Sequence, residues 1–379
     1  MKHHFSTFVV IYKLTFRSRR HILDRLDCNR NFDCFVGAGI ASDFVAGYML
    51  EVLQKEEKKG GIKVAIISDR QVSGYYYNKI ENQFVLRDIK PYLITIDAQD
   101  NNKDLKTVST IIADLTEFDF GPSDCVVAFG GGGVIDCASF AVSLYTGGCG
   151  FIVIPTTLGA MIDSSVSLKS YVNSGKHKDS ASTSNCQNAV FIDPTFLPTV
   201  PVKFRSNGYA QIIRYGVLAD PALLSDLSGI SDSAPSDIRL FLNRAYSARA
   251  ALERKNPQLL TFGNEIASAI EGYFRFMNYS EGEALAISLY ASLPEKIRKV
   301  LEPLYSKLGL SYRLEGVSGS MIRRSLEDTL ARNKDKTVKV VDYDRNADGK
   351  MEWVIREIDK PEAMKLFEKR LAVISPSDG

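Results

Sequence analysis

Short apolar runs alternate with amphipathic stretches through the first half of the chain. Runs rich in Val, Ile and Phe predict buried strands, and the stretches between them show the apolar spacing that is typical of helices. The predicted strands are 34–40, 63–68, 91–97, 125–129 and 151–154, and the predicted helices are 42–59, 71–82, 103–115 and 134–146. Ser42 is the candidate N-cap of the first of these helices. Strands that alternate with helices in this way predict βαβ units and a mainly parallel sheet.

The pattern changes after residues 190–201, a segment that contains three prolines. From Phe204 onward the apolar positions follow an almost wholly helical period. The predicted helices are 204–218, 235–255, 262–277, 281–304 and 318–332. A chain of 379 residues is long enough for two domains. We therefore predict an α/β + α protein, with an α/β domain over 1–201, a helical domain over 202–379 and a ligand site in the cleft between them.

Near its end the helical domain is expected to contain a β-hairpin, around residues 337–355. The segments 337–341 and 351–355 have strand-like sequences and are joined through an Asp-Gly turn. Residues 344–349 also match the first half of an EF-hand calcium loop. Ile355 occupies the position where such a loop has its bidentate glutamate, so the hairpin is favoured and calcium binding is the alternative.

Charge and cysteine content narrow the class of protein. The 47 basic and 45 acidic residues leave a net charge of +2, which predicts no partner among nucleic acids or membrane surfaces. The apolar run 8–12 is too short for a signal peptide or a transmembrane helix, so a first strand is expected there. The six cysteines show no CxxC spacing, which is typical of reduced thiols and predicts a cytoplasmic protein.

Four consecutive glycines, residues 130–133, separate the most apolar strand from the start of a helix. Glycines at this point let a pyrophosphate approach the backbone N–H groups at the helix N-terminus. The loop is not a GxGxxG fingerprint, and a crowded turn that needs small residues is the alternative interpretation. Because Asp136 follows three residues later, we favour a nucleotide-binding loop.

The segment 154–170, IPTTLGAMIDSSVSLKS, follows the next apolar strand. It places Thr156 and Thr157 at the carboxyl end of that strand, where ligands bind in open α/β sheets. Asp163 and Lys169 follow in the same loop and together suit a charged, polyhydroxylated ligand. The alternative is a strand-to-helix turn in which Asp and Ser cap a helix.

These motifs together resemble 3-dehydroquinate synthase and the sugar phosphate cyclases generally. The resemblance rests on GGGG-VID, IPTTLGAMIDSSVSLK, FIDPTFLPTVP, YAQIIRYG and EGEALAISL, and runs from about residue 35 to residue 357. The glycine loop alone also resembles the iron-dependent alcohol and glycerol dehydrogenases. The DSSVxxK loop and the EGE segment favour the cyclases. The resemblance implies that NAD transiently oxidises a hydroxyl of a phosphorylated sugar, phosphate leaves and a carbocycle closes, the work of a carbon–oxygen lyase.

The resemblance also implies roles for particular residues. The matching NAD positions are Asp69, Asp100, Lys103, Gly131, Gly132, Asp136, Thr156, Thr157 and Thr199. The matching substrate positions, if the protein is an enzyme, are Asp163, Lys169, Lys178 and Arg214. Protons would then be handled by Glu253, Glu281 or Glu283.

The metal site that the resemblance implies is altered in this sequence. The family holds a divalent metal through a glutamate and two histidines, and the matching positions are Gln211, Asn264 and Glu281. The four histidines of the chain are His3, His4, His21 and His177. A histidine-based zinc or iron site is therefore excluded from residues 178–379. The three oxygen donors suit a hard cation weakly or hydrogen-bond one another, and we predict a metal-free site.

Other family positions have changed as well. Arg214 replaces a lysine, Ser268 replaces a histidine, and Leu168 replaces a glycine. Two phosphate-binding arginines of the family match Gly147 and Pro257.

Two functions therefore stay open. One is a sugar phosphate cyclase with an altered site, and the other is a non-catalytic protein that binds NAD or a sugar phosphate, as a partner of an active relative. A homodimer is implied, although the arginine that reaches across the family's dimer is missing.

Overall fold

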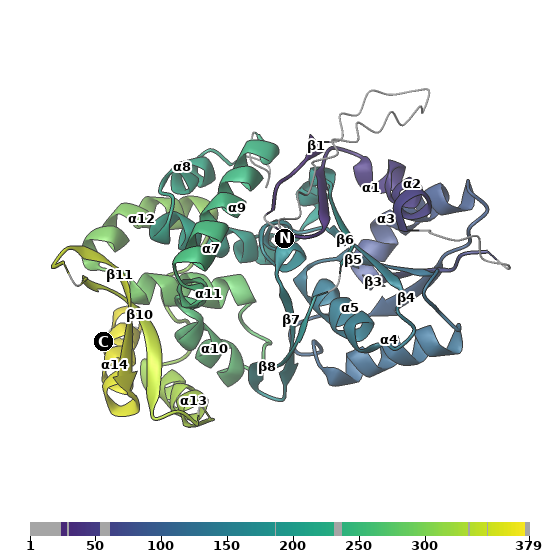
Figure 1. Ribbon diagram of the computed structural model, residues 1–379. Coiled ribbons are helices and arrows are strands. Elements are labelled where there is room, and N and C mark those ends of the chain that lie inside the picture. The colour runs from purple at the N-terminus through teal and green to yellow at the C-terminus, as the bar shows by residue number, and fades with distance from the viewer. Residues whose placement is uncertain are drawn as a thin grey trace, which may run out of the picture.

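The computed structural model describes residues 24–28, 30–53, 61–185, 187–230, 237–332, 334–346 and 348–375. Two parts lie side by side: a sheet covered by helices, which ends with the short helix η3 (Pro194–Thr199), and a mostly helical part that begins with α7 (Val202–Leu218) (Figure 1). This arrangement confirms the predicted fold class, and the exact domain boundary stays a prediction. The strand expected at 8–12 lies outside the described residues.

Seven strands form the main sheet. Their order is β1 (Asp24–Arg25), β2 (Asp33–Val36), β9 (Ala189–Ile192), β6 (Gly150–Pro155), β5 (Cys125–Gly130), β3 (Val64–Asp69) and β4 (Tyr92–Ile96). All pairs are parallel except β1 with β2, which is antiparallel. Every residue of β5 is buried, because helices cover both faces of the sheet at its centre.

The helices on the two faces belong to separate apolar clusters. On one face α4 (Leu105–Glu117) and α5 (Gly132–Leu144) pack through residues such as Ile111 and Ile135 against Val126 of β5. On the other face α3 (Arg70–Val85) packs through Phe84 against Val127. Alternate residues of the strands therefore point to opposite clusters, as a pleated sheet requires.

The first predicted helix differs from expectation. In place of one helix over 42–59, the described residues form α1 (Ile40–Asp43), α2 (Val45–Tyr48) and a π-helical turn η1 (Met49–Leu53). The prediction of Ser42 as N-cap is wrong, because α1 begins after Gly39, whose φ of 78° lies in the left-handed region. The Ser42 hydroxyl donates instead to the Gly39 carbonyl inside the first turn (3.0 Å).

The helical part contains seven helices in its described residues before the C-terminal hairpin. They are α7, α8 (Ala222–Ser228), α9 (Ile238–Lys255), α10 (Asn264–Tyr273), α11 (Glu281–Ser292), α12 (Glu295–Leu308) and α13 (Gly319–Arg332), with the short helix η4 (Pro257–Thr261) between α9 and α10. The single helix predicted over 281–304 is wrong, because the chain leaves α11 at Leu293 and Pro294 precedes α12. Ser280 and Glu283 form a capping box that begins α11, so Glu283 has a structural role.

Two hairpins complete the structure. The predicted one is confirmed as β10 (Thr337–Arg345) and β11 (Met351–Asp359), and α14 (Lys360–Ile374) follows it. The Trp353 indole N–H donates to the Val217 carbonyl (3.1 Å), which ties this hairpin to α7. In its turn the Asn346 side-chain oxygen accepts from the Asp348 and Lys350 N–H groups, so the calcium-loop position is used to shape the turn.

A second hairpin, β7 (Lys169–Ser174) and β8 (His177–Ser184), was not predicted. It contacts α5 in the sheet part and α10 in the helical part. The hairpin therefore links the two parts (Figure 1). None of the helices in the described ranges has the length and hydropathy that crossing a lipid bilayer requires.

Candidate functional site

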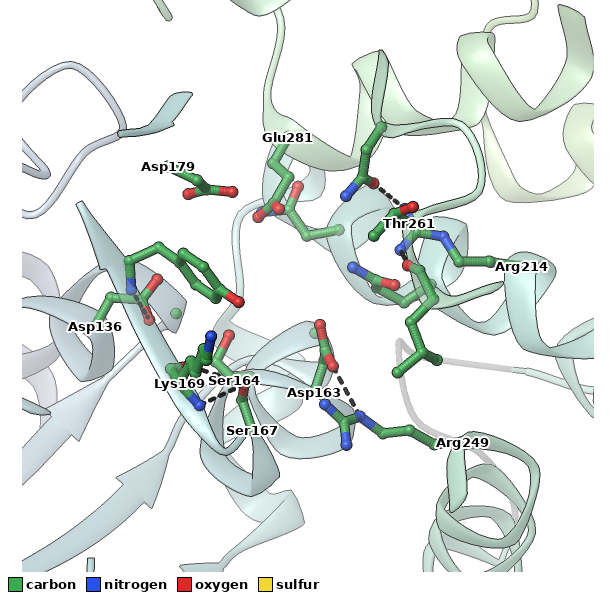
Figure 2. Close-up of a pocket in the computed structure, with 18 of the residues that line it drawn as sticks. Asp136, Asp163, Ser164, Ser167, Lys169, Asp179, Arg214, Arg249, Thr261 and Glu281 are labelled. Atoms are coloured by element: carbon green, nitrogen blue, oxygen red, sulfur yellow. Dashed lines mark hydrogen bonds and ion pairs between the residues drawn. The ribbon is translucent and has the colours of Figure 1, made fainter. Parts of the chain in front are cut away.

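A pocket of about 670 Å³ lies between the sheet part and the helical part, beyond the carboxyl ends of the strands. Both walls are polar, as Figure 2 shows. Six of the seven predicted substrate and proton-handling positions line it, namely Asp163, Lys169, Lys178, Arg214, Glu253 and Glu281, and Glu283 does not. All three metal positions also line it: Gln211, Asn264 and Glu281, which belongs to both groups. Five of the predicted NAD positions also line it: Asp100, Lys103, Gly132, Asp136 and Thr157. The fold thus brings together residues from two halves of the sequence.

The first group of side chains at the pocket is the Asp163 cluster, which consists of Arg30, Asp163, Tyr215, Arg249 and Glu253. All of them except Arg30 line the pocket. One oxygen of Asp163, Oδ1, accepts from the Tyr215 hydroxyl and from Arg249 Nε, each at 3.1 Å. Arg249 also pairs with Glu253 (2.5 Å), which pairs in turn with Arg30 (2.8 Å). The nearby acids raise the pKa of Arg249 against the effect of burial, so its charge is secure.

These contacts bear on the alternative interpretation of the segment 154–170, a strand-to-helix turn in which Asp and Ser cap a helix. Asp163 begins the short helix η2 (Ser164–Val166) but makes no side-chain cap hydrogen bond. Asp163 therefore occupies the N-cap position of η2 without capping it through its side chain. Thr157 does cap a helix, because its hydroxyl accepts from the Ala160 N–H at the start of α6 (Leu158–Ile162).

A second ionic group lies at the glycine loop. Lys103, which is 7% exposed, pairs with Asp136 at 2.9 Å and with Asp179 at 3.4 Å. Burial raises the pKa of Asp136 to about 6, although Lys103 opposes that rise. The buried ammonium therefore has two acids available to balance its charge.

The glycines of the loop have a packing reason of their own. A Cβ on Gly133 would lie 2.1 Å from the Ala98 carbonyl oxygen, and one on Gly132 would lie 2.9 Å from Ser164 Oγ. The crowded-turn interpretation of these two positions is therefore supported by the packing. Gly132 and Gly133 both line the pocket. Because they have no side chains, the backbone at the N-terminus of α5 meets the pocket directly.

A third ionic group joins the two parts of the molecule. The Lys178 ammonium, on β8, contacts both oxygens of Glu271 at 2.9 and 3.0 Å and one oxygen of Glu281 at 3.1 Å. Lys178 holds the pKa of Glu281 down to about 2. Burial raises the pKa of Glu271 to about 8, with Lys178 opposing. Two carboxyl groups share one ammonium, and Glu281 is the one that stays ionised.

The fourth group, which we call the amide cluster, consists of Gln211, Arg214 and Asn264. Gln211 and Arg214 lie one turn apart on α7, and Asn264 is the first residue of α10. Arg214 Nη2 donates to Asn264 Oδ1 at 2.6 Å, and Nη1 donates to the Leu260 carbonyl (Figure 2). Burial lowers the pKa of Arg214. Arg214 Nε and Gln211 Oε1 are buried without any hydrogen-bond partner.

Four predicted NAD positions do not line this pocket. Asp69 caps α3 by accepting from the Gln71 and Val72 N–H groups, both at 2.8 Å. The other three are Gly131, Thr156 and Thr199. Asp69, Gly131 and Thr156 lie at or just beyond the carboxyl ends of β3, β5 and β6, and Thr199 Oγ1 contacts the Tyr76 hydroxyl at 2.8 Å. Their role in cofactor binding stays a prediction.

Several site residues were missed in the sequence. Arg249 and Glu271 pair with residues 86 and 93 positions away, which no local pattern reveals. The spacing of Arg249 and Glu253, four residues apart on a helix, was the one available signal. Tyr215 directly follows Arg214 in the YAQIIRYG motif but carries no distinctive spacing.

Comparison with known proteins identifies the family of this chain. The family model for the N-terminal part of 3-dehydroquinate synthase matches residues 93–206. The 3-dehydroquinate synthase of Clostridium acetobutylicum is 31% identical over 273 residues, which cover 69% of this chain and 74% of the relative. This chain belongs to the 3-dehydroquinate synthase family. The corresponding enzyme of Sulfurovum sp. is 33% identical over 236 residues, or 60% of this chain and 66% of the relative.

Solved structures share the fold across nearly the whole chain. The 2-epi-5-epi-valiolone synthase of Streptomyces hygroscopicus, solved with NAD+ and Zn2+ bound, matches with a TM-score of 0.74 at 22% identity, over 91% of this chain and 97% of that one. A 2-deoxy-scyllo-inosose synthase, solved with carbaglucose-6-phosphate, NAD+ and Co2+, matches with a TM-score of 0.73 at 18% identity, over 92% and 99%. At these identities the likeness establishes the fold.

The positions that match the family's phosphate arginines differ in their surroundings. Pro257 lines the pocket at the start of η4 and offers no charge or donor. Gly147 does not line it, and a Cβ there would lie 2.2 Å from the Tyr145 ring. Neither residue has a charged side chain, so neither can bind phosphate as the resemblance implies for these positions.

Proposed function

We propose that this protein is a sugar phosphate cyclase-like protein that binds NAD and a phosphorylated sugar or polyol in the pocket, at a site that works without a divalent metal. The observation that supports the absence of a metal is that two basic side chains, Arg214 and Lys178, contact oxygen atoms that would have to coordinate the metal. The family membership supports the substrate class.

The residues at the sheet edge fit a dinucleotide. The N-terminus of α5 meets the pocket through Gly132 and Gly133, and the first N–H groups of a helix have no acceptor within the helix. The Asp69 carboxylate lies at the end of the neighbouring strand β3. NAD bound there would supply a hydride acceptor for one substrate hydroxyl.

The residues on the helical side do not fit a divalent metal. Asn264 Oδ1 accepts from a guanidinium at 2.6 Å, and a Glu281 oxygen lies 3.1 Å from an ammonium. A divalent cation would have to displace these contacts and lie beside two positive charges. Within the described part of the chain, no group of three or more His, Cys, Asp or Glu side chains has the arrangement of a metal site. We therefore assign no step to a metal.

The pocket still offers groups that hold a polyol. Among the described residues, both hydrogen bonds to the Asp163 carboxylate end on Oδ1, which leaves Oδ2 to accept from a substrate hydroxyl. Arg249 and Tyr215 fix the orientation of that carboxylate. Lys169 is exposed in the pocket, and its ammonium makes no ion pair within the described residues.

Metal analysis of the purified protein, combined with NAD titration by calorimetry, tests this proposal. We expect NAD to bind, the metal content to be far below stoichiometric, and the NAD affinity to be unchanged after treatment with EDTA. A stoichiometric, tightly held divalent metal would contradict the metal-free site. An absence of NAD binding would contradict the cofactor assignment.

A non-catalytic binding protein is the second candidate, and the same observation favours it. Two of the metal positions, Gln211 and Asn264, are amides, and a guanidinium contacts one of them, so these residues supply no Lewis acid to polarise a carbonyl. Release of inorganic phosphate from seven-carbon sugar phosphates in the presence of NAD would identify an enzyme. Binding of the same compounds without phosphate release would identify a binder or a partner subunit. The homodimer and the cytoplasmic location also stay predictions.

A further inference from the structure

Arg214 differs from the other buried or partly buried basic side chains around the pocket. Lys103, Lys178 and Arg249 each contact at least one carboxylate within 3.1 Å. Arg214 is 4% exposed and, within the described residues, its hydrogen bonds go to two neutral oxygens, those of Leu260 and Asn264. Away from the pocket, the buried Arg370 also has a carboxylate partner, Asp342, at 3.2 Å. In the part of the chain that the structure describes, Arg214 is therefore the one buried arginine without an acid partner.

The Arg214 side chain also has unused donors. A guanidinium carries five N–H donors, and only two hydrogen bonds are present here. The Nε–H group is buried and has no acceptor. Gln211, one turn earlier on the same helix, lines the pocket and also has a buried polar atom without a partner. Because the two ends of an amide are interchangeable by rotation, Gln211 can present its NH2 group on the same wall.

The free-energy cost of burying the Arg214 charge indicates which kind of partner this side chain lacks. An ion removed from water needs a counter-charge or a full set of hydrogen bonds, and Arg214 has neither. Three acids act on the charge of Arg214 without contacting it. Asp163 pairs with Arg249 and Glu281 pairs with Lys178, and within the described residues Glu265 makes no ion pair with Arg214. A ligand that brings its own negative charge would supply both the counter-charge and the acceptors.

We propose that Arg214, assisted by the Gln211 amide, is the oxyanion-recognition site of the pocket and binds a phosphate or carboxylate group of the ligand. The inference deepens the proposed function, on which it rests, by naming the group of the substrate that the helical wall recognises. A guanidinium suits this task because its planar fork matches the two oxygens of a carboxylate or phosphate. A neutral polyol would leave the charge of Arg214 unbalanced.

Calorimetric titration of the full-length protein with inorganic phosphate, and separately with acetate, tests this inference. Four proteins are compared: wild type, Arg214→Met, Arg214→Lys and the surface control Arg323→Met, whose side chain is 51% exposed. We expect the affinity of wild type for the preferred anion to fall about tenfold or more in Arg214→Met. Arg214→Lys keeps the charge but not the fork, so an intermediate affinity is expected. The control should bind as wild type does, and the tighter anion identifies the ligand group.

Two results would overturn the inference. One is that neither anion binds wild type, and the other is that Arg214→Met binds the anion as tightly as wild type does. Arg214→Lys retains a cation and provides the comparison if the methionine variant does not fold. NAD titration of the same samples separates the two proposals, since NAD binding without Arg214-dependent anion binding overturns this inference alone. Anion binding through Arg214 without NAD binding overturns the cofactor assignment alone.

Discussion

Arg249 and Arg214 are buried arginines that line the same pocket, and they have opposite kinds of neighbours. Arg249 contacts the carboxylates of Asp163 and Glu253 at 3.1 and 2.5 Å. Arg214 contacts an amide oxygen and a backbone carbonyl. The first arginine has its charge balanced within the protein, whereas the second does not.

This difference separates two uses of a buried charge. A balanced ion pair fixes the positions of its members, and here it orients Asp163 towards the pocket. An unbalanced charge stabilises the folded protein little or not at all, but it keeps its attraction for a ligand. The Asp163 cluster is therefore expected to matter for stability and the amide cluster for binding.

The largest expected effect comes from removing each arginine in turn. Arg249→Met leaves Asp163 and Glu253 without their shared partner, and we expect a loss of about 3 kcal/mol in the free energy of unfolding. Arg214→Met removes a charge without stranding another, so we expect a change within about 1 kcal/mol. Urea denaturation followed by circular dichroism measures both. Equal losses in the two variants would remove the distinction between the clusters.

A smaller effect concerns pH, because Glu271, which contacts Lys178, is a titratable acid, whereas the three members of the amide cluster include no acid. The pKa of Glu271 is about 8 in the folded protein and 4.5 in the unfolded chain. Between these values the folded protein holds a proton that the unfolded chain has released, so rising pH favours unfolding. The contribution of Glu271 is fully present below the unfolded pKa and is lost as the pH passes the folded one. We expect wild type to lose roughly 2 kcal/mol over this window relative to Glu271→Gln.

Urea denaturation at a series of pH values measures this difference. Gln211→Met is the matched control in the amide cluster, where no acid titrates, and it should show the pH dependence of wild type. A Glu271→Gln variant with an unchanged pH dependence would indicate that Glu271 is ionised throughout the range.

Much of the fold was predictable because its sheet is buried on both faces. Strands such as β5 then appear as continuous apolar runs, and the helices between them have apolar faces of their own. The β7–β8 hairpin was missed because most of β8, His177–Ser184, is polar and partly exposed. The break before α12 was missed because the apolar period continues across Pro294, although the proline itself was a signal.

The site was predictable only as far as its motifs extend. Asp163, Lys169 and Lys178 were found because they lie in motifs of the sheet part, and they line the pocket. The partners that determine their chemistry, Arg249 and Glu271, come from distant helices and from no motif. The sequence showed that the metal positions had changed, but it did not show that a guanidinium contacts one of them.

The central claim is that Arg214 lacks a counter-charge which a ligand supplies, and a carboxylate built beside it tests this directly. In Asn264→Asp, the new acid replaces an amide oxygen that lies 2.6 Å from Arg214 Nη2. Asn264→Ala is the matched control, because it removes the amide without adding charge. Phosphate titration by calorimetry should show an affinity about tenfold or more below wild type in Asn264→Asp, and within about threefold of wild type in Asn264→Ala. Phosphate binding to Asn264→Asp that is as tight as binding to wild type would contradict the claim.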